Sequence, residues 1–291
     1  MKRSEFLRAL ALGTLSLPLW SRAMHAMLTD LPRQEMRMPA LFMGHGNPMN
    51  ALVNNTFTRA WERTAAELPR PAAILCISAH WETRGTRVTA MPQPRTIHDF
   101  GGFPRALYEM QYPAPGAPAF ADDTRTLVRS QPVALDQEWG LDHGTWSVLA
   151  RMYPAADIPV FQLSLDVGLD ARAHYELARQ LAPLRDHGVL IMGSGNIVHN
   201  LRLADLSDTA PAYDWAIAFD AKARQLIEEG DHTSLISYGS LGREAQLSIP
   251  TAEHYLPLLY VLAQQDPRDS VSFPVEGMAF RSGSMRAVLL S

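Results

Sequence analysis

The chain has 291 residues, of which 47% are hydrophobic and 19% are charged. This composition is that of an ordinary globular protein long enough to bury a sizeable core, which excludes disordered, collagen-like and coiled-coil proteins. The 26 basic and 30 acidic residues include no basic block that could neutralise a row of phosphates, so we expect no nucleic-acid partner.

Residues 1–26 have the layout of an export signal. Three basic residues, Lys2, Arg3 and Arg8, precede an apolar run at residues 9–20, and small residues follow that run. The run is shorter than the ~20 apolar residues of a membrane-spanning helix but suits the core of a signal peptide. We therefore expect no membrane span and a periplasmic location. The alternative is an ordinary amphipathic N-terminal helix on a cytoplasmic protein.

From residue 38 onward, short apolar runs alternate with segments of helical period. The runs contain β-branched residues and end in glycine or polar residues, which is typical of buried parallel strands. The helical segments place apolar residues at steps of three and four. The predicted strands are residues 39–44, 72–78, 158–165 and 188–195, and the predicted helices are residues 56–68, 119–130, 170–184 and 213–229. The alternation predicts an α/β fold, with residues 38–291 forming a single domain whose central, mostly parallel sheet is flanked by helices.

Residues 91–118 form a long connection that is rich in proline and glycine and contains several aromatic residues. Long ordered loops in compact domains are usually functional. We expect this segment to form a lid or wall over the functional site.

Cysteine and histidine usage limits the kind of site that the chain could hold. The single cysteine, Cys76, excludes a disulfide framework and any metal site built on several thiolates. Cys76 also lies within an apolar run, where we expect it to be buried. The chain has ten histidines. A metal site would therefore use nitrogen and oxygen ligands.

Three histidines come directly after predicted strands. His45, His80 and His199 follow the first, second and fourth of them. In open α/β sheets, ligands bind beyond the carboxyl ends of the strands, so we expect a common site there. A histidine at such a position could instead cap the next helix, but three of the four predicted strands supply one.

Other histidines are weaker candidates. His254 is expected to open a helix, where it could be a ligand or simply exposed. His143 follows Asp142 in an expected strained, site-facing turn, and His98 lies in the expected wall. The remaining four are expected at the surface: His25, His174, His187 and His232.

Six segments carry a resemblance to a known family. They are MPALFMGHGNPMNAL, ISAHWETRGT, TIHDFGGFPRALYEMQYPAPG, WGLDHGTWSVL, SGNIVHNLR and PTAEHYLPLLYVL, in this order along the chain. Together they resemble the 4,5-DOPA extradiol dioxygenase family. That family belongs to the class III extradiol ring-cleavage dioxygenases, the superfamily of the protocatechuate 4,5-dioxygenase catalytic subunit.

The resemblance implies roles for individual residues. His45, His80 and His254 would ligate one divalent metal. His199 would sit beside the metal as the catalytic acid/base, and in some members it is a fourth ligand. It also implies that His143 contacts the substrate. From their places in the sequence we expect Asp142 to hold His143, and we expect Trp81, Trp146 and His98, the last from the expected wall, to surround the aromatic ring.

The cofactor follows from the implied reaction. Zinc can polarise a substrate but cannot pass electrons to O2, so an active enzyme should hold Fe(II), with Zn(II) as a substitute taken up during purification. The implied partners are a small aromatic diol and O2, both of whose atoms enter the product. The diol would bind the metal through both oxygens while His199 moves the protons. DOPA as substrate rests on the resemblance alone, and the sequence carries no indication of oligomeric state.

Two other functions use the same histidines. A zinc hydrolase would attack an ester or amide with metal-bound hydroxide, and it would work without O2. A catalytically silent zinc-binding protein would need a closed site with His199 as fourth ligand. Oxygen uptake in the presence of a catechol distinguishes both from a dioxygenase.

Overall fold

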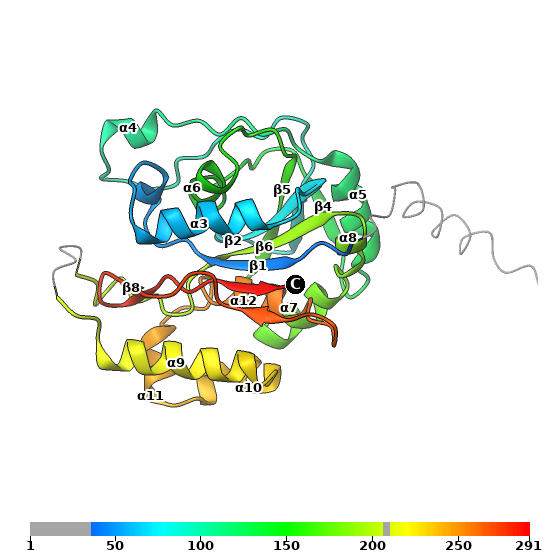
Figure 1. The fold of residues 1–291 in the computed structure, drawn as a ribbon. Coiled ribbons are helices and arrows are strands. Elements are labelled where there is room, and N and C mark those ends of the chain that lie inside the picture. The colour runs from blue at the N-terminus through cyan, green and yellow to red at the C-terminus, as the bar shows by residue number, and fades with distance from the viewer. Residues whose placement is uncertain (1–35, 206–209) are drawn as a thin grey trace, which may run out of the picture. The chain divides into compact units, whose positions relative to one another are not determined.

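An eight-stranded mixed sheet crosses the computed structural model, which describes residues 36–205 and 210–291 (Figure 1). The predicted export signal and His25 lie outside the described residues, so both remain predictions. In their order across the sheet, the strands are β4 (Val133–Asp136), β3 (Thr86–Thr89), β5 (Val160–Asp166), β2 (Ala73–Thr83), β6 (Val189–Gly195), β1 (Ala40–Gly44), β10 (Val288–Leu290) and β7 (Val271–Ser272). A separate two-stranded sheet pairs β8 (Met278–Ala279) with β9 (Gly283–Ser284).

The four predicted strands form the parallel centre of the sheet. They are β5, β2, β6 and β1, and each is parallel to its neighbour. The predicted α/β class and central sheet are therefore confirmed. The short strands β3, β4, β7 and β10 were not predicted. β3 pairs antiparallel with β5 and β10 pairs antiparallel with β1, which makes the sheet mixed.

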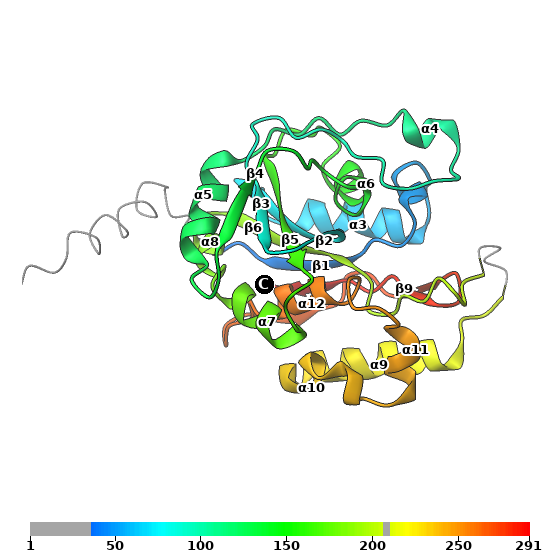
Figure 2. The same cartoon turned by 180° about the vertical axis from the view of Figure 1, so that it is seen from behind.

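Helices cover both faces of the sheet. Figures 1 and 2 show α3 and α6 on one face, and α7 and α12 on the other, with α9, α10 and α11 outside α12. The helices are α3 (Thr56–Glu67), α4 (Arg105–Tyr108), α5 (Pro118–Leu127), α6 (His143–Met152), α7 (Ala171–Arg179), α8 (Pro183–Asp186), α9 (Asp214–Glu228), α10 (His232–Ile236), α11 (Arg243–Ser248) and α12 (Leu256–Leu262), with 3-10 turns η1 (Pro48–Ala51) and η2 (Tyr238–Ser240). Among the described residues, no helix is long and apolar enough to cross a membrane.

The predicted helices agree with the structure except at residues 170–184. That segment breaks after Arg179 and restarts as α8 at Pro183, because proline has no N–H with which to continue a helix. α9 ends as predicted, with Gly230 in the left-handed conformation at φ +68 just beyond it.

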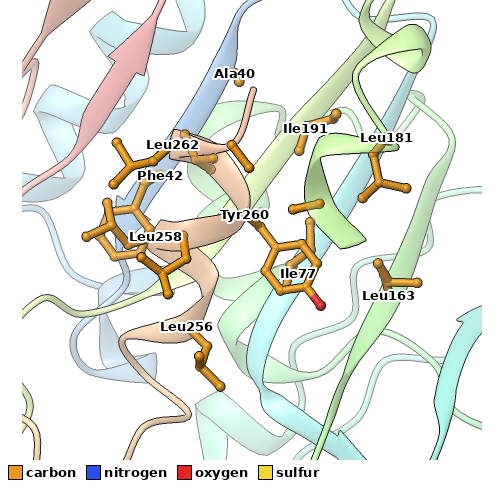
Figure 3. Close-up of a cluster of buried hydrophobic side chains, with 14 of the residues drawn as sticks. Ala40, Phe42, Ile77, Leu163, Leu181, Ile191, Leu256, Leu258, Tyr260 and Leu262 are labelled. Carbon is orange, nitrogen blue, oxygen red and sulfur yellow. The ribbon is translucent and has the colours of Figure 1, made fainter. Parts of the chain in front are cut away.

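Two hydrophobic clusters hold the layers together. Successive side chains of β1 point to opposite faces, so that Phe42 packs under α12 while Leu41 packs toward α3 and α6. Figure 3 shows Phe42 beside Leu258 and Leu262 of α12. Cys76 is fully buried in β2, as predicted.

The prediction that His174, His187 and His232 lie at the surface was wrong. His174 is 1% exposed because it shares the inner face of α7 with Leu177 and Ala178, at the three- and four-residue steps that one helix face requires. His187 is also buried, and His232 is half-buried with its Nδ1 2.8 Å from the hydroxyl of Tyr175.

Candidate functional site

A cavity of about 470 Å³ lies where the carboxyl ends of β1, β2 and β6 meet. Five histidines line one part of it, and apolar side chains line most of the rest. The histidines are His45, His80, His143, His199 and His254, and the larger apolar residues are Phe100, Phe103, Leu201, Phe280 and Met285. The fold thus brings together the five histidines to which the sequence assigned catalytic or metal-binding roles.

His45 is held in place by β1 and β6, two neighbouring strands that end at the cavity. It follows β1 directly, and its backbone N–H donates to the carbonyl of Gly195 at 3.1 Å. Its Nδ1 lies 3.0 Å from the hydroxyl of Ser194, which itself donates to the carbonyl of Gly144 at 2.5 Å. Because that hydroxyl hydrogen is already used, the oxygen accepts from Nδ1–H of His45, and Nε2 keeps its lone pair.

His80 lies in the irregular part of β2, beyond the register shift that begins after Ile77. Its Nε2 is 3.2 Å from Nε2 of His45. Gly144 allows the start of α6 to approach this ring closely: a Cβ at that position would lie 2.8 Å from Cδ2 of His80 and 2.6 Å from Oγ of Ser78. A side chain at residue 144 would therefore displace His80.

His254 lines the cavity from the segment that precedes α12. It lies in a turn two residues before α12, so the expectation that it opens the helix was wrong by that margin. Its Nδ1 is 3.0 Å from Oε1 of Glu253, and its backbone carbonyl accepts from the N–H of Asn196 at 2.8 Å. The carboxylate can only accept here, so Nε2 of His254 also keeps its lone pair.

The rings of His45, His80 and His254 surround one point. Their centroids lie 5.0, 5.2 and 5.0 Å apart, and one nitrogen from each ring lies within 4.8 Å of the others. Two nitrogens bound to one ion at about 2.1 Å would lie roughly 3.0–3.4 Å apart, which the 3.2 Å between His45 and His80 matches. Ligating histidines also donate their second N–H to a hydroxyl or carboxylate, as His45 and His254 do. These residues fit a divalent metal ion.

His199 lies beside this group rather than facing its centre. Its ring stacks on that of His254, with centroids 3.4 Å apart and planes inclined by 11°. An imidazole binds a metal in its own ring plane, and these two stacked planes do not converge on one point. A nitrogen of His199 nevertheless lies within 4.8 Å of ligand atoms of Glu253 and His254. The backbone N–H of His199 donates to Ser248, whereas neither ring nitrogen bonds to a described residue.

Asp99, from the expected wall, holds His143. Its Oδ2 lies 2.9 Å from Nδ1 of His143, and its Oδ1 accepts the backbone N–H of the same residue at 2.9 Å. The same Oδ2 lies 3.6 Å from Nδ1 of His80, which is too long for a hydrogen bond. The prediction that Asp142 holds His143 was therefore wrong. The signal that could have found Asp99 is its place directly after His98 in the aromatic wall segment.

Asp142 has a structural position below the cavity. It is the N-cap of α6, where its Oδ1 accepts from the N–H of Thr145 at 3.1 Å. Its side chain is fully buried and also accepts hydrogen bonds from Ser78 and Gln162. His143 is thus the first residue of a regular, capped helix rather than part of a strained turn, and Asp142 does not line the cavity.

Three of the residues assigned to the substrate do not reach the cavity. Trp146 is fully buried and donates its Nε1–H to Ile97, and Trp81 stacks on Trp139. His98 points away to the carbonyl of Met110. Trp146 and His98 thus use their polar atoms in hydrogen bonds within the protein and do not offer them to a substrate.

The wall prediction is confirmed for one short stretch. Within residues 91–118, all of them described, the cavity is lined by Phe100, Gly101, Gly102 and Phe103. The ring of Phe100 meets that of His143 edge to face, with centroids 5.6 Å apart. The aromatic surface that the sequence assigned to the two tryptophans is therefore supplied by phenylalanines.

Burial keeps four of the cavity histidines neutral: His45, His80, His199 and His254. Burial, reinforced by the neighbouring imidazoles, lowers the pKa of His45 and His254 well below the usual value. Burial likewise lowers the pKa of His80 to about 3 and that of His199 to about 4. Neutral imidazole is the form that binds metals. For Asp99, burial alone would raise the pKa, but the hydrogen bonds from His143 outweigh it and the pKa lies below its usual value.

Comparisons with known proteins identify relatives of this chain. Residues 39–267 match the family described as the catalytic LigB subunit of aromatic ring-opening dioxygenase. The chain is 50% identical over 270 residues to 4,5-DOPA dioxygenase extradiol of Escherichia coli (strain K12), which covers 91% of this chain and 99% of that protein. It is 40% identical over 228 residues to 4,5-DOPA dioxygenase extradiol of Beta vulgaris, covering 75% of this chain and 83% of that protein.

A solved structure shares the fold. The crystal structure of an uncharacterized protein from Escherichia coli K12 is similar with a TM-score of 0.77 and 45% sequence identity. The similarity covers 88% of this chain and 100% of that chain. The α/β architecture around the cavity is thus found in a protein solved by experiment.

Proposed function

Because this chain belongs to the family of the catalytic LigB subunit of aromatic ring-opening dioxygenases and is an extradiol ring-cleavage enzyme, we propose that it opens a small aromatic diol at the five-histidine cavity. The observation that carries the assignment of the reaction to this cavity is the 3.2 Å approach of Nε2 of His45 to Nε2 of His80, with the ring of His254 beside them. Their hydrogen bonds to Ser194 and Glu253 leave Nε2 of His45 and of His254 without a hydrogen, so both nitrogens can donate a lone pair to a metal ion.

His45, His80 and His254 would hold one divalent metal ion, Fe(II) for turnover, with Zn(II) competing for the same nitrogens. When bound, such an ion supplies positive charge toward the diol oxygens and, if it is redox-active, electrons for O2. Ser194 and Glu253 hold two of the ligating rings in the required tautomer.

His199 is placed to move protons. It lines the cavity next to His254, and its ring nitrogens are not engaged by other described residues. A neutral imidazole in this position can accept a proton from a diol hydroxyl and return it later in the reaction. The stacking on His254 fixes the plane of the ring. We therefore assign His199 as the acid/base and not as a ligand.

His143 would contact the diol from the side of the wall. Its Nδ1–H is committed to Asp99, so Nε2 is the nitrogen that a substrate hydroxyl can reach. The flat faces of Phe100 and Phe103 and the side chain of Met285 offer an apolar surface for the aromatic ring. The other residues that the sequence assigned to the substrate do not line the cavity, so any effect they have on the diol would pass through the lining residues. They are Trp81, Trp146, His98 and Asp142.

The names of the relatives suggest a DOPA-like substrate, and a cavity of about 470 Å³ has room for a single ring with a side chain.

The proposed function is tested by measuring oxygen uptake by protein that has been loaded with Fe(II) in the absence of air. The measurement uses a panel of catechols and also follows the absorbance of the ring-opened product. We expect O2 and catechol to be consumed in equal amounts. Zn(II)-loaded protein is the control and should take up no O2. Fe(II)-loaded protein that consumes no O2 with any catechol would overturn the proposal.

A further inference from the structure

The carboxylate of Asp99 reaches two of the histidine rings in the cavity from the wall segment. Oδ1 accepts the backbone N–H of His143 at 2.9 Å, and Oδ2 lies 2.9 Å from Nδ1 of the same residue. Oδ2 also lies 3.6 Å from Nδ1 of His80. The two oxygens therefore clamp His143 at its backbone and its ring, and the same carboxylate adjoins a proposed metal ligand.

The donor and the acceptor of both hydrogen bonds between Asp99 and His143 can be assigned in only one way. A backbone N–H can only donate, so it occupies Oδ1. A carboxylate can only accept, so Nδ1 of His143 must carry the hydrogen that points to Oδ2. Nε2 of His143 is then the acceptor nitrogen of a ring that lines the cavity.

The clamp also joins the wall to the site. Asp99 stands between His98, which bonds back to the carbonyl of Met110, and Phe100, whose ring packs on that of His143. The contact between Asp99 and His143 therefore both anchors the wall segment and orients the ring of His143. The Asp99 side chain is 17% exposed, so water competes little for its oxygens.

We propose that Asp99 is a positioning residue that fixes both the orientation and the tautomer of His143, so that Nε2 of His143 accepts a hydrogen bond from a hydroxyl of the diol. The identity of that hydroxyl compound rests on the proposed function. The clamp itself does not. Asp99 does not line the cavity, so it would act through His143.

Replacing the carboxylate of Asp99 by an amide should invert the tautomer of His143 without changing the shape of the side chain at residue 99. In Asp99→Asn, the amide oxygen must still face the backbone N–H of His143, so the amide NH2 faces Nδ1 of the ring. Nδ1 then has to accept, and the hydrogen moves to Nε2. The ring would present a donor where the substrate hydroxyl needs an acceptor.

The tautomer can be read directly by nitrogen NMR of histidine-labelled, Zn(II)-loaded protein, with His143→Gln to assign the signal. We expect Nδ1–H in the wild type and Nε2–H in Asp99→Asn, with unchanged metal content. In the Fe(II) enzyme, kcat should fall at least about tenfold while KM stays within about threefold. Glu109→Gln, the same chemical change at an exposed site of the wall segment, is the matched control and should alter none of these quantities.

Each result decides the proposal. An Asp99→Asn protein with the wild-type tautomer, or with an inverted tautomer and unchanged kcat, overturns it. If Asp99→Asn does not fold, Asp99→Glu takes its place, since the longer side chain shifts the carboxylate and should lower kcat at constant metal content. If the wild type turns over no catechol, the proposed function fails, while the NMR comparison still decides whether Asp99 sets the tautomer.

Discussion

Nε2 of His45 lies 3.2 Å from Nε2 of His80, although the two residues come from strands that are not neighbours. β6 lies between β1 and β2, and the chain crosses over it on the way from one to the other. Such a crossing leaves a crevice at the carboxyl ends of the strands, which is where open α/β sheets bind their ligands. The short distance between the nitrogens is thus a consequence of topology, and it suits the metal site that we propose in the crevice.

His199→Ala should separate metal binding from turnover. The ring of His199 stacks on His254 and does not share a plane with it, so its loss should leave the bound metal near one ion per chain. Removing an acid/base group typically lowers the rate by about 10²–10⁴-fold. We expect a loss of kcat in that range, measured by oxygen uptake, with metal content measured by elemental analysis.

His45→Ala is the comparison for that variant. It removes one of three ligands and should lose both metal and turnover. A His199→Ala enzyme with normal turnover would contradict the acid/base assignment, and one that is also depleted of metal would place His199 among the ligands.

Ser194→Ala should weaken metal binding without removing a ligand. The Ser194 hydroxyl receives the Nδ1–H of His45 and passes its own hydrogen to Gly144, so its loss frees the ring to rotate or change tautomer. Loss of such an outer partner typically costs about 10–100-fold in metal affinity. Competition with a chromophoric chelator measures the affinity of the wild type and the variant for Zn(II).

Ser147→Ala is the matched control for Ser194→Ala. Ser147 is equally buried, and its hydroxyl has no hydrogen-bond partner among the described residues. Its replacement should leave the affinity within about twofold. Equal affinities for wild type and Ser194→Ala would show that the hydroxyl does not orient His45.

The parallel centre of the sheet could be predicted from the sequence because its strands are continuous apolar runs. β3 and β4 could not, because they have only four residues each and carry no comparable run. Helix α7 shows the limit of judging residues singly. His174 looks like a surface residue until the spacing to Leu177 places it on the inner face.

In the site, too, some residues could be predicted from the sequence and others could not. Histidines after strands could be predicted because strand ends converge whatever the details of packing. The partner of His143 could not, since it depends on how residues 91–118 fold back over the sheet, and that path has no periodic pattern. Trp146 was assigned to the substrate on its residue type, but its place on α6 turns it into the core.

The charge on the substrate's side chain should matter little to turnover. In the described part of the chain, no lysine or arginine lines the cavity, and its walls away from the histidines are largely apolar. Among the described residues, a tail of either charge therefore finds no opposite partner in the cavity lining. We expect kcat/KM for DOPA, for dopamine and for a catechol with a carboxylate tail to agree within about tenfold, which corresponds to about 1.4 kcal/mol.

A neutral catechol of the same length serves as the reference for that comparison. A preference for one tail charge of a hundredfold or more, measured in the same buffer, would show that a charged group recognises the tail. Measurements at low and high salt would then show whether that group is exposed.

His174 should make the protein less stable in mild acid. Burial lowers its pKa to about 4, and its Nδ1 is 2.9 Å from the hydroxyl of Tyr260. The unfolded chain binds a proton at this residue below about pH 6.5, whereas the folded protein does so only below about pH 4. The free energy of unfolding contributed by His174 is therefore complete above the unfolded pKa and falls as the pH drops through this window.

Between pH 7 and pH 5 this single group should cost about 2 kcal/mol, measured by urea unfolding. Other buried histidines titrate in the same direction, so the comparison is with His174→Asn, which keeps a polar atom near Tyr260 but cannot be protonated. The variant should be less stable at pH 7, yet its stability should fall by about 2 kcal/mol less on acidification. Parallel pH profiles for the two proteins would show that His174 is not held neutral by burial.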